Sequence, residues 1–73
     1  MLEEEFARDM TRIELLRRIV SDRQYAEVEG MTVDLFTASA MVQVFDALSP
    51  DMQAKFERLP LAKVALFAMS KVS

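Results

Sequence analysis

The stretch Asp34–Leu48, DLFTASAMVQVFDAL, decides the fold. Asp34 is a favoured N-cap residue, and the length and spacing of the apolar residues that follow indicate a helix over 34–48. Its only other polar positions are Thr37, Ser39, Gln43 and Asp46. A helix that is apolar around nearly its whole circumference is covered by other elements on most of its sides. The rest of the chain must therefore supply neighbours for it.

Two prolines divide the part of the chain that follows. Ser49-Pro50-Asp51 is a typical helix start, with a serine cap, a proline in the first position and an acid in the first turn. Pro60 disfavours helical geometry at Leu59. These signals predict a short helix over 50–58 and a last helix over 60–72. The last helix again lacks a properly polar face, because its polar residues are only Lys63, Ser70 and Lys71.

The N-terminal part predicts an amphipathic helix over 3–22. Its apolar stripe recurs at steps of three and four and consists of Leu2, Phe6, Met10, Ile13, Leu16 and Val20. A competing helix start exists at Thr11, because Thr11-Arg12-Ile13-Glu14 reads as a capping box. We favour one long helix, since the stripe continues through Met10.

The segment 24–33 holds the only glycine of the chain, in the pair Glu29-Gly30. This pair fits the turn of a short hairpin. An isolated two-stranded hairpin is marginal in water, so an ordered loop held against the helices by Tyr25, Val28 and Val33 is the alternative that we favour. The predicted fold is therefore an all-α bundle of about four helices, in one domain over 1–73, with a short hairpin or ordered loop at 24–33.

The chain carries more apolar surface than one small domain buries. It has 73 residues, of which 52% are hydrophobic, against roughly 45 to 50% in soluble domains. Leu66, Phe67 and Met69 cannot all share one core with Leu61 and Val64, so large side chains must lie on a second face of the last helix. The alternative is that alanines account for much of the apolar count. An alanine-rich face with scattered apolar residues is normal on the surface of a monomer.

We predict that a second chain covers this excess. The chain would form a homodimer through 34–48 or 60–72, or offer a groove to a helix of another protein. The candidate protein-interface residues are the large side chains that fit least easily into one core: Phe36, Phe45, Leu66, Phe67 and Met69.

The sequence contains few of the residue types that catalysis, phosphate binding and metal binding use. The chain contains no histidine and no cysteine, and one glycine is too few for a phosphate-binding loop. We therefore expect no enzyme, no cofactor and no metal site. The net charge of −3 gives no general attraction to nucleic acid or anionic lipid. The longest apolar run, Val64–Met69, is far below the ~18 to 20 residues of a membrane span, and the acidic start does not resemble a signal peptide, so we expect a cytoplasmic protein.

The sequence also resembles a group of small uncharacterised helical proteins encoded by actinobacterial phages. The resemblance covers about residues 11 to 72 and rests on VDLFTASA at 33–40, VFDAL at 44–48, Lys55-Phe56 and Leu59-Pro60. Similar members carry a tyrosine in place of Phe45 and often an asparagine in the turn near 49–53. By comparison with them, residues 1–10 look like a variable N-terminal extension. The resemblance implies no catalytic or binding residues. It implies a small phage-encoded product in the host cytoplasm, of the kind that engages a host protein.

Three functional hypotheses follow from the sequence. The first is a non-enzymatic protein-binding module that self-associates and engages a host or phage protein through an apolar helix surface. The second is a structural or assembly component of a phage particle, in which the apolar surface is a lattice contact. The third is a DNA-binding regulator, which the mixed charges of the short helix at 50–58 disfavour.

Overall fold

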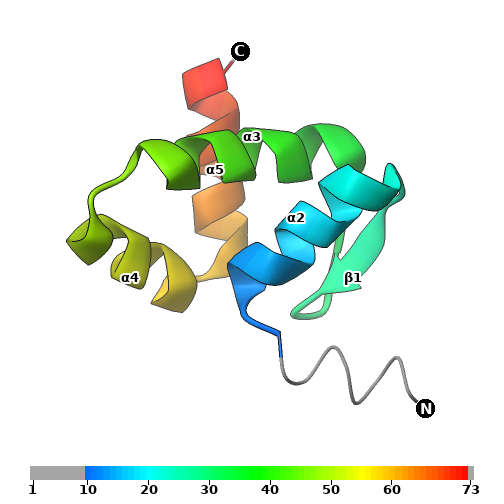
Figure 1. Ribbon diagram of the computed structural model, residues 1–73, viewed down its shortest axis with the longest axis horizontal. Helices are drawn as coiled ribbons and strands as arrows, with labels where there is room; N and C mark the ends of the chain where they lie inside the picture. Colours follow the sequence, from blue (N-terminus) through cyan, green and yellow to red (C-terminus); the bar gives the residue numbers. More distant parts are fainter. Residues whose placement is uncertain (1–9, 73) are drawn as a thin grey trace.

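The computed structural model describes residues 10–72 as a mostly helical globule with one small hairpin (Figure 1). Its helices are α2 (Arg12–Asp22), α3 (Leu35–Ala47), α4 (Pro50–Arg58) and α5 (Leu61–Val72), and its strands are β1 (Ala26–Val28) and β2 (Met31–Val33). The helices predicted over 34–48, 50–58 and 60–72 are confirmed to within one residue. The prediction of a mostly helical domain is confirmed, but the fold is not purely all-α. Residues 24–33 contain the short hairpin that the sequence left open and not the ordered loop that we favoured.

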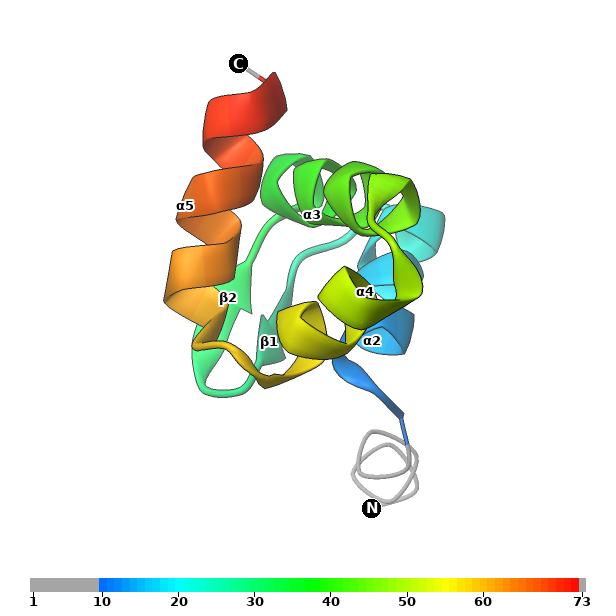
Figure 2. The same ribbon diagram turned by 90° about the vertical axis from the view of Figure 1, so that its left-hand side faces the viewer.

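Helix α3 is the centre of the packing. It lies between α2 and α5 and packs against both (Figures 1 and 2). Its small residues Ala38 and Ala40 are buried together with Met41, which lets the neighbouring helices approach closely. The buried hydrophobic core consists of Leu16, Ile19, Val28, Val33, Ala38, Ala40, Met41, Phe56, Leu61, Val64, Ala65 and Ala68. Every helix and both strands contribute to it.

The hairpin closes the globule below α3. Its antiparallel register pairs Val28 with Met31 across the turn residues Glu29 and Gly30, whose φ angles are 52° and 81°. Positive φ at both central residues is the geometry of a type I′ turn, which suits the twist of a hairpin. Val28 and Val33 are buried in the core, so tertiary packing stabilises strands that would be marginal alone. Tyr25 does not help to hold this segment, because it is 73% exposed.

The prediction of one unbroken helix over 3–22 is wrong at Thr11, because Thr11 is the N-cap of α2, which begins at Arg12. Thr11 is extended, with ψ 166°, and forms a complete capping box with Glu14. The Thr11 hydroxyl accepts a hydrogen bond from the Glu14 N–H at 3.3 Å, and the Glu14 carboxylate accepts one from the Thr11 N–H at 2.8 Å. These local bonds outweigh the continuity of the apolar stripe. The part of the prediction over 3–9 lies outside the described residues.

Arg12 ties the start of α2 to two distant segments. Its side chain is 5% exposed, and its Nε and Nη2 each donate to the Glu29 carboxylate at 2.6 Å. Its Nη1 donates to the backbone carbonyl of Phe56 at the end of α4. The backbone N–H groups of Arg12 and Ile13 both donate to the Glu57 carboxylate at 3.1 Å. A carboxylate in this place also complements the positive end of the α2 dipole.

Replacing Arg12 by leucine should lower the free energy of unfolding by about 3 kcal/mol, because the Phe56 carbonyl and the hairpin turn lose their shared donor. Urea denaturation followed by circular dichroism measures this loss. The matched control is Arg17→Gln, which removes an exposed pair with Asp46 and should cost much less. Equal losses in the two variants would contradict the central role of Arg12.

Stability should depend on pH through Glu29. The hydrogen bonds from Arg12 hold the pKa of Glu29 below its ordinary value of 4.5. Because the folded pKa is the lower one, the stabilisation is complete above that ordinary value and is lost as the pH falls through the folded value. Glu29→Gln should therefore be less stable than the wild type near neutral pH. Urea midpoints of the two proteins should converge at acid pH; a constant difference would contradict the assignment.

Candidate protein-docking surfaces

The outer face of α5 carries large apolar side chains that the core does not use. Leu66 is 73% exposed and Phe67 is 50% exposed, whereas the opposite side of the helix is buried through Leu61, Val64, Ala65 and Ala68. The predicted second face of this helix is thus confirmed for Leu66 and Phe67. Met69 is half-buried and packs against the core at the edge of this face. We call the exposed side, with Ala62, Lys63, Leu66, Phe67, Ser70 and Lys71, the α5 surface.

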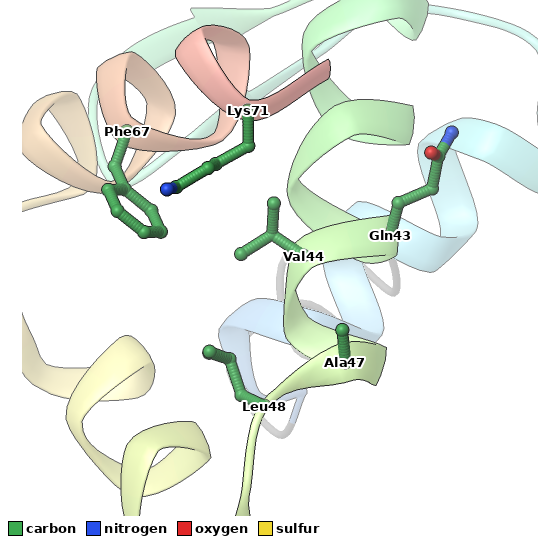
Figure 3. Close-up of a pocket in the computed structure, with 6 residues that line it drawn as sticks. All are labelled: Gln43, Val44, Ala47, Leu48, Phe67 and Lys71. Atoms are coloured by element: carbon green, nitrogen blue, oxygen red, sulfur yellow. The ribbon is translucent and has the colours of Figure 1, made fainter.

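A groove between α3 and α5 adjoins the α5 surface. It has a volume of about 340 Å³ and is lined by Gln43, Val44, Ala47, Leu48, Phe67 and Lys71. Figure 3 shows Phe67 and Lys71 facing Val44 and Leu48 across the opening. The Lys71 ammonium lies 5.3 Å from the centroid of the Phe67 ring, a favourable cation–π arrangement. The groove therefore combines mostly apolar walls with one positive charge at its rim.

A second exposed apolar surface lies at the opposite end of α3. Tyr25 and Phe36 are 73% and 61% exposed, and Leu35 is 38% exposed. They line two adjoining hollows of about 500 and 630 Å³ that share Arg23 and Leu35. We call this the α2–α3 surface; its lining residues are Val20, Arg23, Gln24, Tyr25, Asp34, Leu35, Phe36 and Ser39. Unlike the α5 surface, it contains a carboxylate, that of Asp34, as well as a cation.

The structure does not bring the five predicted interface residues together. Leu66 and Phe67 lie on the α5 surface, and Phe36 lies on the α2–α3 surface. Phe45 is half-buried and forms a T-shaped pair with Phe56, with 5.0 Å between the ring centroids. The Arg17 guanidinium lies over the Phe45 ring, 5.9 Å from its centroid. Whether any of the five contacts a partner stays a prediction.

Sequence reasoning missed several residues of these surfaces. Val44 and Leu48 line the groove, although both carry the same apolar signal as core positions. Tyr25 and Leu35 were equally indistinguishable from buried residues in the sequence. Periodicity identifies apolar positions, but the side of a helix that remains uncovered depends on which neighbours pack against it.

The acidic groups near these surfaces have structural roles. The pKa of Asp34 is lowered because its carboxylate accepts the Thr37 backbone N–H at 2.7 Å, as the N-cap of α3. The pKa of Asp46 is lowered by its hydrogen bonds from Arg17, which join α2 to α3. Among residues 10–72, no cluster of histidine, cysteine, aspartate and glutamate side chains is arranged to hold a metal ion. None of the helices in this range combines the length and apolar character of a membrane span.

In comparisons with known proteins, no family model, curated protein or solved structure matches the chain. The two surfaces are therefore interpreted from their own composition and geometry.

The α5 surface should be dispensable for folding, and two leucines of the same helix test this. Leu66→Ala should change the free energy of unfolding by no more than ~0.5 kcal/mol, because Leu66 is already in water. Leu61→Ala should cost about 2 to 4 kcal/mol, because Leu61 is 6% exposed in the core. Chemical denaturation of the two variants measures both values. Similar losses would show that Leu66 serves the fold instead of a partner.

Proposed function

We propose that this protein is a non-enzymatic protein-binding module that self-associates and engages a second protein. The proposal rests on one observation: large apolar side chains are exposed on two separate faces, at opposite ends of α3. Contiguous exposed apolar groups next to hollows are typical of protein–protein contact sites. The residues Phe36 and Phe67 mark the two faces.

The α2–α3 surface suits a second copy of this chain. Two-fold association requires a self-complementary surface, since each residue meets the same patch of the other copy. Arg23 and Asp34 line one hollow, so the Arg23 of each copy can face the Asp34 of the other. Tyr25, Leu35 and Phe36 supply the aromatic and apolar centre that interfaces favour.

The α5 surface suits a different partner. Its charged residues, Lys63 and Lys71, are both positive, so two copies brought together here would repel each other. An acidic segment with apolar side chains complements both the positive charge and the apolar groups of this surface. The resemblance to proteins of actinobacterial phages makes a host or phage protein in the host cytoplasm the partner class that we propose.

Sedimentation velocity tests the self-association. The wild type should sediment as a dimer at tens of micromolar, because each copy buries the Phe36 surface of the other. Phe36→Asp should give a monomer of 8.3 kDa, since it places a charge in the interface. Phe67→Asp is the matched control and should remain dimeric. A monomeric wild type, or a dimer that only Phe67→Asp disrupts, would contradict the assignment.

The second partner is tested by capture from lysate of the native host. The wild type should recover a partner that Phe67→Asp does not recover, because the substitution places a carboxylate at the apolar rim of the groove. Phe36→Asp serves as the control that leaves the α5 surface intact. Equal recovery by the wild type and Phe67→Asp would contradict a role for this surface.

A structural component of a phage particle is the second candidate. Two separate docking faces are also what a subunit needs to contact neighbours on two sides of a lattice. This candidate predicts that the chain is present in purified particles and forms species larger than a dimer. The binding-module proposal predicts neither.

A further inference from the structure

A lysine stands one helical turn to each side of Phe67 on α5. Because Lys63, Phe67 and Lys71 recur every four positions, they form one row along the helix. From 63 to 71 the helix rises by about 12 Å, which sets the spacing of the two lysines along its axis. All three side chains are exposed. The row therefore presents an aromatic ring between two cations.

The two lysines of this row have no acidic partner in the described structure. Among residues 10–72, neither Lys63 nor Lys71 forms an ion pair with a carboxylate. The stretch 59–73 contains no aspartate and no glutamate. Asp46, the only acidic residue of α3, is held by Arg17 of α2 at 2.6 Å. Both lysines can therefore receive carboxylates from another molecule.

The walls of the groove favour a helix as the occupant. Their lining residues come from α3, from its C-cap Leu48 and from α5. The interior backbone groups of a helix bond within that helix, so these walls offer no strand edge to an extended partner. A helix satisfies its own backbone groups and needs only side-chain contacts.

The lining residues also repeat at a spacing that a helix can match. Val44 and Leu48 are four positions apart, as are Phe67 and Lys71 on the other wall, and Figure 3 shows these four side chains around the opening. On a partner helix, side chains four positions apart lie roughly 6 Å from each other on one face. Two apolar side chains at this interval can enter the groove together.

A lipid surface fits the row less well than a protein helix does. Apolar groups flanked by lysines also occur on helices that lie on anionic membranes. Here the apolar groups border a hollow of about 340 Å³, which the plane of a membrane does not fill. The net charge of −3 also opposes binding to anionic lipid.

We propose that the second protein binds the α5 surface through an acidic amphipathic helix of defined pattern. Two apolar residues of this helix, four positions apart, enter the groove and contact Phe67. Two carboxylates seven or eight positions apart, about 10 to 12 Å along the axis, reach Lys63 and Lys71. This inference rests on the proposed function of the α5 surface and adds the form of the partner. Since these ion pairs are at the surface, added salt weakens the binding.

Selection from a library of random peptides tests the pattern. The target is the full-length Phe36→Asp protein, because this variant has lost an aromatic centre of the α2–α3 surface. Peptides that it retains, and that the same protein with Phe67→Asp does not, should be acidic and carry apolar residues four positions apart. Reversing both lysines, with Lys63→Glu and Lys71→Glu, should turn the selection toward basic peptides.

A charge reversal of the same size away from the groove is the matched control. Arg23 and Lys55 are exposed and lie outside the groove lining, so Arg23→Glu with Lys55→Glu should still select acidic peptides. For one selected peptide, fluorescence anisotropy should show about tenfold weaker binding to the Lys63→Glu, Lys71→Glu protein and nearly unchanged binding to the control. Proline in the middle of the peptide should weaken binding far more than alanine there, because proline breaks a helix.

The outcomes separate this inference from the function on which it rests. If no selected peptide depends on Phe67, the α5 surface is not a protein-docking site and both ideas fail. Phe67-dependent peptides that tolerate proline, or that bind the charge-reversed protein equally well, would leave the docking function standing and overturn the acidic helix. Vesicles that contain phosphatidylserine should not co-sediment with the protein. Co-sedimentation that Phe67→Asp abolishes would identify a lipid surface as the occupant and overturn the inference.

Discussion

The guanidinium of Arg12 joins three parts of the chain that are distant in the sequence: the start of α2, the hairpin turn and the end of α4. It holds the Glu29 carboxylate of the hairpin turn and the Phe56 carbonyl at the end of α4, while the start of α2 is held by Glu57. Glu29 has a positive φ of 52°, a conformation that glutamate adopts at a cost. The ion pair with a buried guanidinium offsets that cost and fixes the turn against α2. The position of the hairpin, and with it the burial of Val28 and Val33, follows from this arrangement.

A second constraint comes from the small side chains of α3. Because Ala38 and Ala40 are buried, α2 and α5 can pack closely against α3 on two sides. Close packing of so short a chain encloses little volume, and the core holds few large residues. Phe36, Leu66 and Phe67 consequently lie outside it. The exposed apolar surfaces are thus a direct result of how tightly the helices meet.

The α2–α3 surface and the α5 surface differ in the charges that they carry. Arg23 and Asp34 both line the α2–α3 surface, whereas the charged residues of the α5 surface are lysines only. The first combination fits the proposed contact with a second copy, and the second fits the proposed acidic partner.

The sequence by itself determined the helices whose ends are set by local chemistry. Asp34, Ser49, Pro50 and Pro60 fix the bounds of α3, α4 and the start of α5, because caps and prolines act within a few residues. The sequence also predicted that Leu66 and Phe67 cannot share the core with Leu61, since helical periodicity alone separates the two faces.

The tertiary structure decided what depends on contacts between distant residues. The hairpin over 26–33 forms because Arg12 binds its turn and the core covers Val28 and Val33. Phe45 turns inward because Phe56 lies beside it, while Phe36 has no such neighbour and stays in water. Both phenylalanines carry the same apolar signal in the sequence. Their burial differs because different elements pack beside them. Which elements pack there depends on the whole chain and cannot be read from the residues around either phenylalanine.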